Sequence, residues 1–279
     1  MARLLLSDEQ HDYIVQGVRE DFRNDGRSCK DYRKFELSTG MITNANASAR
    51  VKLGGSDVLV GVKAELVEPD PTRPNEGRLH FQVECSALAS PEFERRGGEE
   101  LGATLAHMMS RAYQHDSCVD LGGLCVSPGQ RCWVLYIDGL VTEWGGNVID
   151  CLSFAIRVAL HQTRLPHVVA SGEGDEMEIE VSQETRSLQG TNLPIYITLS
   201  QVANSNSLVV DTTLEEAMCV SCRVMVAVNE DGHLCGFTKE GRGGISAALL
   251  NEALTVAREV SNDVIRTLNS LIGTSMDVT

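Results

Sequence analysis

Apolar residues recur along this chain with two different periods, and each period occupies its own stretches. Between residues 79 and 85, apolar and polar side chains alternate, a period of two that predicts a half-buried strand. From residue 99 onward the apolar residues return every three or four positions, which predicts one buried face of a helix. A chain that carries both patterns must pack helices against a sheet, so the fold class we expect is α+β.

The predicted elements form two successive series. The first contains a hairpin over residues 49–62, the strand and helix just described, a strand at 132–141 that is apolar on both faces, and a helix after Gly146. The second starts again with strands and ends in a long helix, for which Gly273 is the expected end. We therefore expect a single domain over residues 1–279, built from two related strand-and-helix halves.

The two halves are expected at about residues 1–165 and 190–279, with an acidic segment between them that includes residues 173–184. An internal echo supports this division, because Arg50-Val51 in the first hairpin is repeated as Arg223-Val224 in the second half. We interpret the echo as evidence for a duplicated architecture.

The composition excludes several classes of protein. The formal net charge is −15, whereas a free nucleic-acid binder usually carries the opposite sign, so any RNA contact must be local or shared with basic partners. No run approaches the roughly 18 apolar residues that a membrane span needs, and the first residues do not form a signal peptide. We therefore expect a protein that stays inside the cell and has no membrane partner.

The nine cysteines do not form a metal-binding pattern. Cys219 and Cys222 form a lone CxxC, but a zinc site needs two further ligands at suitable spacing, and no second such pair follows. The expected state is a set of buried free thiols, with no metal and no cofactor.

A series of short motifs runs through nearly the whole chain. The motifs are Asp25-Gly26-Arg27, Asp31-Tyr32-Arg33, Ser48-Ala49-Arg50-Val51, Ser90-Pro91-Glu92-Phe93, Gly145-Gly146-Asn147-Val148-Ile149-Asp150 and Val210-Asp211. In order and spacing they resemble the RNase PH family, the phosphate-dependent 3′-to-5′ exoribonucleases and their relatives in exosome rings. The resemblance implies an RNase PH-like fold with two related strand-and-helix halves.

Two positions depart from the pattern of the active family members. Those members carry Gly-Gly-Thr-Arg where this chain has Gly145-Gly146-Asn147-Val148, and an Asp at the place aligned with Ser221. Phosphorolysis needs cationic groups for two anionic reactants, and an acid that handles a proton or positions a metal. Valine and serine supply neither, so the resemblance implies a protein that is not an enzyme. The expected function is a scaffold in the RNA exosome core ring that helps thread RNA for 3′-to-5′ processing and degradation.

Two other functions stay open at this point. The first is an active phosphate-dependent 3′-to-5′ exoribonuclease with a displaced site, for which Glu215 and Glu216 are the nearest acids; the plainer interpretation makes them exposed glutamates in a loop or first helical turn. The second is an acidic binding module without any role in RNA metabolism. Activity on RNA with phosphate separates the active enzyme from the scaffold, and co-purification with paralogous subunits separates the scaffold from the binding module.

The candidate RNA-binding residues are Arg95, Arg96, His107 and Arg111. His107 and Arg111 lie four residues apart on the predicted helix, and the resemblance aligns them with basic positions that face RNA in a non-catalytic ring subunit. Arg95 and Arg96 immediately precede that helix. The glycine-rich stretch 241–244 lacks the Lys-Ser/Thr of a phosphate-binding loop, and we expect it to be a turn that caps the last helix.

The resemblance also implies partners and a location. The partners are paralogous RNase PH-like subunits in a hexameric ring, RNA-binding cap subunits, an associated nuclease, and RNA. The expected location is the nucleus and nucleolus, and also the cytoplasm.

Overall fold

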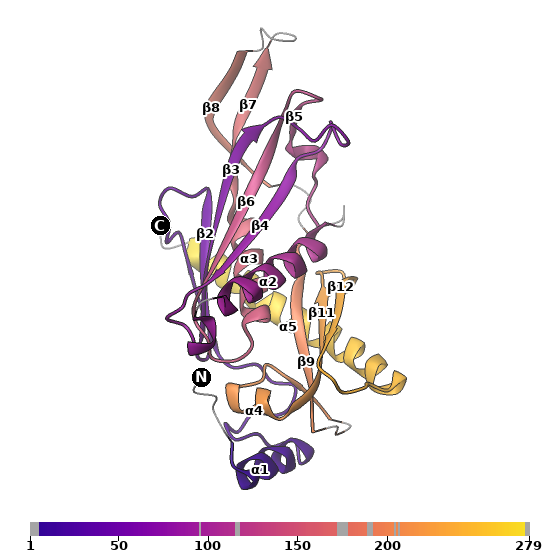
Figure 1. Cartoon of the computed structure of the whole chain (residues 1–279). Coiled ribbons are helices and arrows are strands. Elements are labelled where there is room, and N and C mark those ends of the chain that lie inside the picture. The colour runs from indigo at the N-terminus through magenta and orange to yellow at the C-terminus, as the bar shows by residue number, and fades with distance from the viewer. Residues whose placement is uncertain are drawn as a thin grey trace.

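The larger of two main sheets belongs to the first half of the chain (Figure 1). The structure is a computed structural model that describes residues 6–94, 96–114, 118–171, 178–188, 192–203, 205 and 207–276. The strand order is β1-β2-β3-β6-β4, with β5 paired to β6, and β4–β6 is the parallel pair. The strands are β1 (Phe35–Thr39), β2 (Ala47–Leu53), β3 (Ser56–Val67), β4 (Arg78–Cys85), β5 (Cys125–Ser127) and β6 (Arg131–Glu143).

The smaller sheet belongs to the second half and is antiparallel throughout, in the order β10-β9-β11-β12. Its strands are β9 (Ile195–Val202), β10 (Leu208–Val210), β11 (Val220–Val228) and β12 (Leu234–Glu240). Between the halves, β7 (Arg164–Ser171) and β8 (Glu178–Ser187) form a separate two-stranded hairpin that extends from the top of the molecule in Figure 1.

The remaining regular elements are helices. They are α1 (Asp8–Arg19), α2 (Gly97–Tyr113), α3 (Val148–Gln162), α4 (Leu214–Met218) and α5 (Ala247–Met276), with short 3₁₀ turns at Pro91–Phe93 and Gly122–Leu124. Helix α3 contacts β2 and β3 of the large sheet and β9 of the small one, so it lies between the sheets. Every residue from 150 to 160 is buried, as expected for a helix that is covered on all sides. One hydrophobic core therefore joins both halves.

The periodic stretches of the sequence fold as predicted. The first hairpin is formed by β2 and β3, with Leu53 opposite Ser56 at the turn, and the alternating stretch 79–85 lies in β4. The last helix differs from its prediction, because α5 continues through Gly273 to Met276. Gly273 has no positive φ, and the preceding Ile272 is buried, so packing of the apolar face carries the helix onward. Within the described ranges, no helix is long and apolar enough to cross a membrane.

Helix α2 approaches the edge strand β4 closely at two glycines. A Cβ atom on Gly102 would lie 2.3 Å from the carbonyl oxygen of Val83, and one on Gly98 would lie 2.9 Å from that of Cys85. No side chain fits at the first distance, so the seam between α2 and β4 depends on glycine. This packing holds the exposed face of α2, with its candidate RNA-binding residues, in a fixed position on the sheet.

Two glycine-to-alanine substitutions in helices test this packing and are expected to act in opposite directions. Gly102→Ala should lower the free energy of unfolding by about 1–3 kcal/mol, because overpacking against Val83 outweighs the gain in helix propensity. A Cβ atom on Gly273 would have no atom within 4 Å, so Gly273→Ala should raise the free energy of unfolding by up to about 1 kcal/mol. Urea unfolding of both variants measures the two effects; equal effects would contradict the close approach of α2 to β4.

Candidate functional site between the two halves

Two loops, one from each half of the chain, meet beside the start of α3. The loop before α3 contains Gly145 and Gly146, and Thr212 lies in the loop between β10 and α4. A Cβ atom on Gly146 would lie 2.4 Å from the Thr212 carbonyl oxygen, and the φ of Gly146 is 121°, so this approach requires glycine. A Cβ atom on Gly145 would lie 2.2 Å from the carbonyl carbon of Gly55. The start of α3 is therefore pressed against both the second half and the β2–β3 turn.

The carboxylate of Asp211 is the polar centre of this junction. It is fully buried and accepts hydrogen bonds from Arg33 through Nε (2.8 Å), Nη2 (2.7 Å) and the backbone N–H (2.9 Å), and from Arg27 Nη1 at 3.2 Å. Arg33 Nη1 also donates to the carbonyl oxygen of Gly145 at 2.7 Å. Arg33, from the N-terminal segment, therefore links the loop before α3 in the first half to Asp211 in the second half.

A buried ion pair lies beside this centre. Arg23 donates from Nε to Glu216 at 2.8 Å, and the two side chains are 0% and 4% exposed. Glu216 also accepts the backbone N–H of Thr213 at 2.8 Å in the capping box that begins α4. The expectation that Glu215 and Glu216 are both exposed is therefore wrong for Glu216, because its carboxylate neutralises a buried arginine; Glu215 is exposed. A carboxylate held in this way is not free to act as an acid.

Asp150, in the first turn of α3, forms a second buried polar centre. Its carboxylate accepts hydrogen bonds from Tyr32, from Thr198 through N (3.0 Å) and Oγ1 (2.7 Å), and from the N-cap residue Asn147. Burial raises the pKa of Asp150 to about 6, although these donors act to lower it. This role of Asp150 was not predicted from the sequence; the local signal for it is Asn147, three residues earlier at the N-cap of α3.

Neither Val148 nor Ser221 brings a charged group into the junction. Val148 is the first residue of α3 and is 3% exposed, packed in the main core. Ser221 lies at an irregularity in the pairing of β11 with β9; its hydroxyl donates to the Gln201 carbonyl oxygen at 3.1 Å, and its own carbonyl accepts the N–H of Gly243 at 3.0 Å. Neither side chain can bind phosphate by charge or move a proton at neutral pH.

A cavity of about 360 Å³ opens beside Gly145. The ionisable residues among those that line it are all acidic: Asp25, Glu215 and Glu216. Carboxylates repel an incoming phosphate, so the cavity does not suit the anionic reactants of phosphorolysis. No group of three or more possible ligands for a metal occurs within the described ranges.

The predicted RNA-binding residues that the structure describes lie on α2. Arg96 is at its N-cap, and Arg96, His107 and Arg111 are all exposed. At about 100° per residue, the three fall on one side of the helix, with the exposed Glu100 between Arg96 and His107. Arg95 lies outside the described residues. Their contact with RNA remains a prediction.

The stretch 241–244 does not itself cap the last helix. Ser246 caps α5, because its hydroxyl accepts the N–H of Leu249 at 3.2 Å. The glycines instead let the chain pack on Ser221: a Cβ atom on Gly241 would lie 2.6 Å from the Ser221 carbonyl oxygen. Cys219 and Cys222 are both buried thiols.

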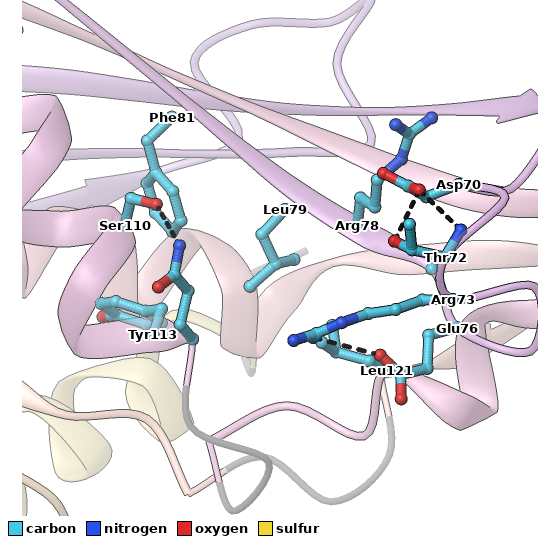
Figure 2. A pocket seen from close by; sticks show the side chains of 12 residues that line it. Asp70, Thr72, Arg73, Glu76, Arg78, Leu79, Phe81, Ser110, Tyr113 and Leu121 are labelled. Atoms are coloured by element: carbon cyan, nitrogen blue, oxygen red, sulfur yellow. Dashed lines mark hydrogen bonds and ion pairs between the residues drawn. The ribbon is translucent and has the colours of Figure 1, made fainter.

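Figure 2 shows another cavity, of about 390 Å³, at the start of β4 and the end of α2. Its charged residues interact locally: Arg73 pairs with Glu76 at 3.4 Å, and Asp70 accepts hydrogen bonds from Thr72. It shares no lining residue with the junction of the two halves, and its polar groups do not converge on one point. The junction is therefore the stronger candidate site.

Comparisons with known proteins agree with this architecture. Residues 31–166 match a family described as "3' exoribonuclease family, domain 1", and residues 192–260 match domain 2 of that family. The chain is 36% identical over 253 residues to exosome complex component Rrp42 of Thermococcus kodakarensis, covering 91% of this chain and 92% of that protein. It is 33% identical over 311 residues to a Dictyostelium discoideum protein provisionally named exosome complex exonuclease RRP42, covering 93% and 95%.

Among solved structures, a chain from the Archaeoglobus fulgidus exosome with RNA bound to the active site superimposes with a TM-score of 0.81. The two chains are 27% identical, and the match covers 93% of this chain and 98% of the other. The similarity therefore extends over both halves and the junction between them.

The buried carboxylate of Asp150 leads to a testable prediction about the pH dependence of stability. Tyr32→Phe should lower the free energy of unfolding by about 1.5–3 kcal/mol at pH 8, because the buried carboxylate loses a donor. The pKa of Asp150 in the folded state, about 6, already lies above its ordinary 3.8, and the variant raises it further. Below pH 6, protonation of Asp150 removes the buried charge that lacks the Tyr32 donor. The decrease in the free energy of unfolding caused by Tyr32→Phe should therefore be smaller at pH 5 than at pH 8.

Tyr113→Phe is the matched control, because Tyr113 donates to the neutral carbonyl oxygen of Pro194 at 2.9 Å. Tyr113→Phe should lower the free energy of unfolding by the same amount at pH 5 and at pH 8, as measured by chemical denaturation. A Tyr32→Phe effect that is constant from pH 5 to 8 would show that the Asp150 carboxylate does not titrate in this range.

Proposed function

The chain belongs to the RNase PH family of 3′ exoribonucleases, and from that premise we propose that it is a non-catalytic subunit of an exosome core ring. The observation that carries this proposal is the similarity, over more than nine tenths of both chains, to proteins named exosome complex component Rrp42. Its role is to scaffold the ring and to help thread RNA for 3′-to-5′ processing and degradation.

The geometry of the junction supports a non-catalytic role. The position of the phosphate-binding arginine holds Val148, which is buried in the core, and the position of the catalytic aspartate holds Ser221. Each missing electrostatic contributor typically lowers the rate ~100–1000-fold. Glu216 does not offer a displaced acid, because it is paired with Arg23. These observations favour the scaffold over an active phosphorolytic exoribonuclease.

The partners follow from the same proposal. They are paralogous RNase PH-like subunits in a hexameric ring, RNA-binding cap subunits, an associated nuclease, and RNA itself. A location in the nucleus and nucleolus, and also in the cytoplasm, goes with this assignment. Arg95, Arg96, His107 and Arg111 would face the RNA path, and the exposure of the last three supports that role.

Reconstitution with paralogous subunits tests the assembly and the lack of activity together. Native mass spectrometry should show this chain in a hetero-oligomeric ring, since permanent interfaces of about 2,000 Å² or more form stable complexes. The pure chain should release no nucleoside diphosphate from labelled RNA and phosphate. A monodisperse monomer without affinity for such subunits would overturn the assembly, and phosphate-dependent release that Glu215→Gln abolishes would overturn the lack of activity.

The basic residues of α2 are tested in the assembled ring by the salt dependence of RNA binding. Each phosphate contact contributes about −0.7 to the slope of log affinity against log salt for a single strand. Arg96→Ala with Arg111→Ala should therefore flatten that slope by roughly 1.4 and weaken binding without changing base preference. Arg19→Ala with Arg266→Ala removes the same charge from α1 and α5 and is expected to leave the slope unchanged. An unaltered slope in the α2 variant would assign its residues to solvated surface.

A further inference from the structure

Two thiols from different halves of the chain lie in contact beside the end of α2. Cys118 follows α2 in the first half, and Cys235 lies in β12 of the second half. A hydrogen bond joins the two thiol groups. Cys118 is fully buried, whereas Cys235 is half-buried, so solvent reaches one member of the pair. Neither residue takes part in the junction around Asp211.

An irregularity in the small sheet directs Cys235 toward α2. The register of β12 against β11 shifts between Leu234 and Gly236, so Cys235 has no directly opposite residue and forms a β-bulge. A bulge changes the direction of a side chain relative to the regular alternation of a strand. A Cβ atom on Gly236 would lie 3.7 Å from the Cβ atom of Ala112, so this part of β12 packs on the last turn of α2 (Figure 1).

Cys118 reaches the same turn of α2, and its backbone is tied to the second half. Its Sγ atom donates to the carbonyl oxygen of Ala112 at 3.5 Å. Its own carbonyl oxygen accepts the N–H of Asn192 at 3.0 Å. Asn192 Oδ1 in turn accepts the N–H of Glu230 at 3.0 Å, in the turn between β11 and β12. Hydrogen bonds therefore hold the backbone on both sides of the thiol pair.

Cys235 differs from the other cysteines in its acidity. The hydrogen bond from Cys118 lowers the pKa of Cys235, against the effect of burial. The thiolate is the form of cysteine that reacts, so a lowered pKa favours reaction at this sulfur. Cys125 is the other half-buried cysteine, and its pKa is raised. Burial raises the pKa of six thiols in all: Cys29, Cys85, Cys125, Cys132, Cys151 and Cys219.

We propose that Cys118 and Cys235 form a thiol–disulfide exchange site, which reacts with a small disulfide such as glutathione disulfide and closes into a reversible bond between the two halves. The Cys235 thiolate attacks one sulfur of the small disulfide, whose S–S bond breaks and releases one thiolate that takes a proton from water. Cys118 then loses its proton to water and attacks the Cys235 sulfur, which releases the second thiol. Two protein thiols are oxidised and one small disulfide is reduced to two thiols.

Incubation of the full chain in glutathione buffers of increasing disulfide content tests the site. The wild type should lose two hydrogens in intact-mass measurement, and its digest should contain a peptide that links Cys118 to Cys235. Cys118→Ser keeps a hydrogen-bond donor and should stop at the mixed disulfide of Cys235 with glutathione. Cys235→Ser should leave Cys118 reduced. Cys125→Ser is the matched control and should form the same bond as the wild type.

The sites of reaction decide between this pair and the other cysteines. Cys125 and Cys132 are directly opposite in the register of β5 and β6, so they are the competing pair. A wild type that stays reduced in every buffer, or that links Cys125 to Cys132 instead, overturns the proposal. In Cys118→Ser, glutathione should add to Cys235 at least about threefold faster than to Cys125. Equal rates would contradict the assignment of Cys235 as the attacking thiol.

Stability gives a second readout. A bond between distant parts of a chain stabilises the fold mainly by restricting the unfolded state. The oxidised wild type should therefore unfold at a higher urea concentration than the reduced protein, and dithiothreitol should reverse the shift. Cys235→Ser should unfold at the same urea concentration with and without glutathione disulfide. An oxidised wild type that unfolds at a lower concentration would show that the bond strains the fold, against the contact of the two thiols in the native state.

The mapping of the wild type does not depend on how the variants fold, and it uses this chain alone. Its result is therefore independent of the proposed assembly into a ring.

Discussion

The buried carboxylate of Asp211 gathers two arginines from a segment that precedes it by 178 residues or more. Arg33 bonds this carboxylate and, through its remaining nitrogen, the backbone of the loop before α3. Two sheets that share a core could slide past one another on apolar contacts alone, since these have little directionality. The arginine fork fixes their relative position, because each of its bonds requires a defined geometry.

Helix α3 carries the same constraint into the interior. It is buried along its length, and through Asp150 it collects donors from the N-terminal segment and from β9. The junction that would bear the family's chemistry is thus occupied by groups that hold the fold: Asp211 and Glu216 neutralise arginines, and Val148 fills the core. The architecture of this junction is therefore maintained by charges that are paired for structural reasons.

The sequence predicted the elements whose residues repeat at short range. The β2–β3 hairpin, strand β4 and the apolar stripe of α2 follow from local periods, and the two uncharged positions follow from the family resemblance. The Arg23–Glu216 pair could not be predicted, since its partners are 193 residues apart and neither lies in a periodic pattern. Tyr32 and Thr198, two donors to Asp150, are likewise distant from it in sequence, by 118 and 48 residues. The end of α5 was wrongly predicted at Gly273 for another reason, because burial of Ile272 outweighs the local preference of glycine to end a helix.

The span of the Arg23–Glu216 pair also sets an order of events during synthesis. Translation at about 5–20 residues per second delivers Glu216 roughly 10–40 s after Arg23, from the 193 residues that separate them. Throughout that interval Arg23 and Arg33 have been synthesised before their carboxylate partners exist, and α3 lacks the second sheet that covers it. The first half of this protein therefore waits on the nascent chain as an incomplete folding unit, with Arg23 and Arg33 unpaired, until the second half emerges with Glu216 and Asp211.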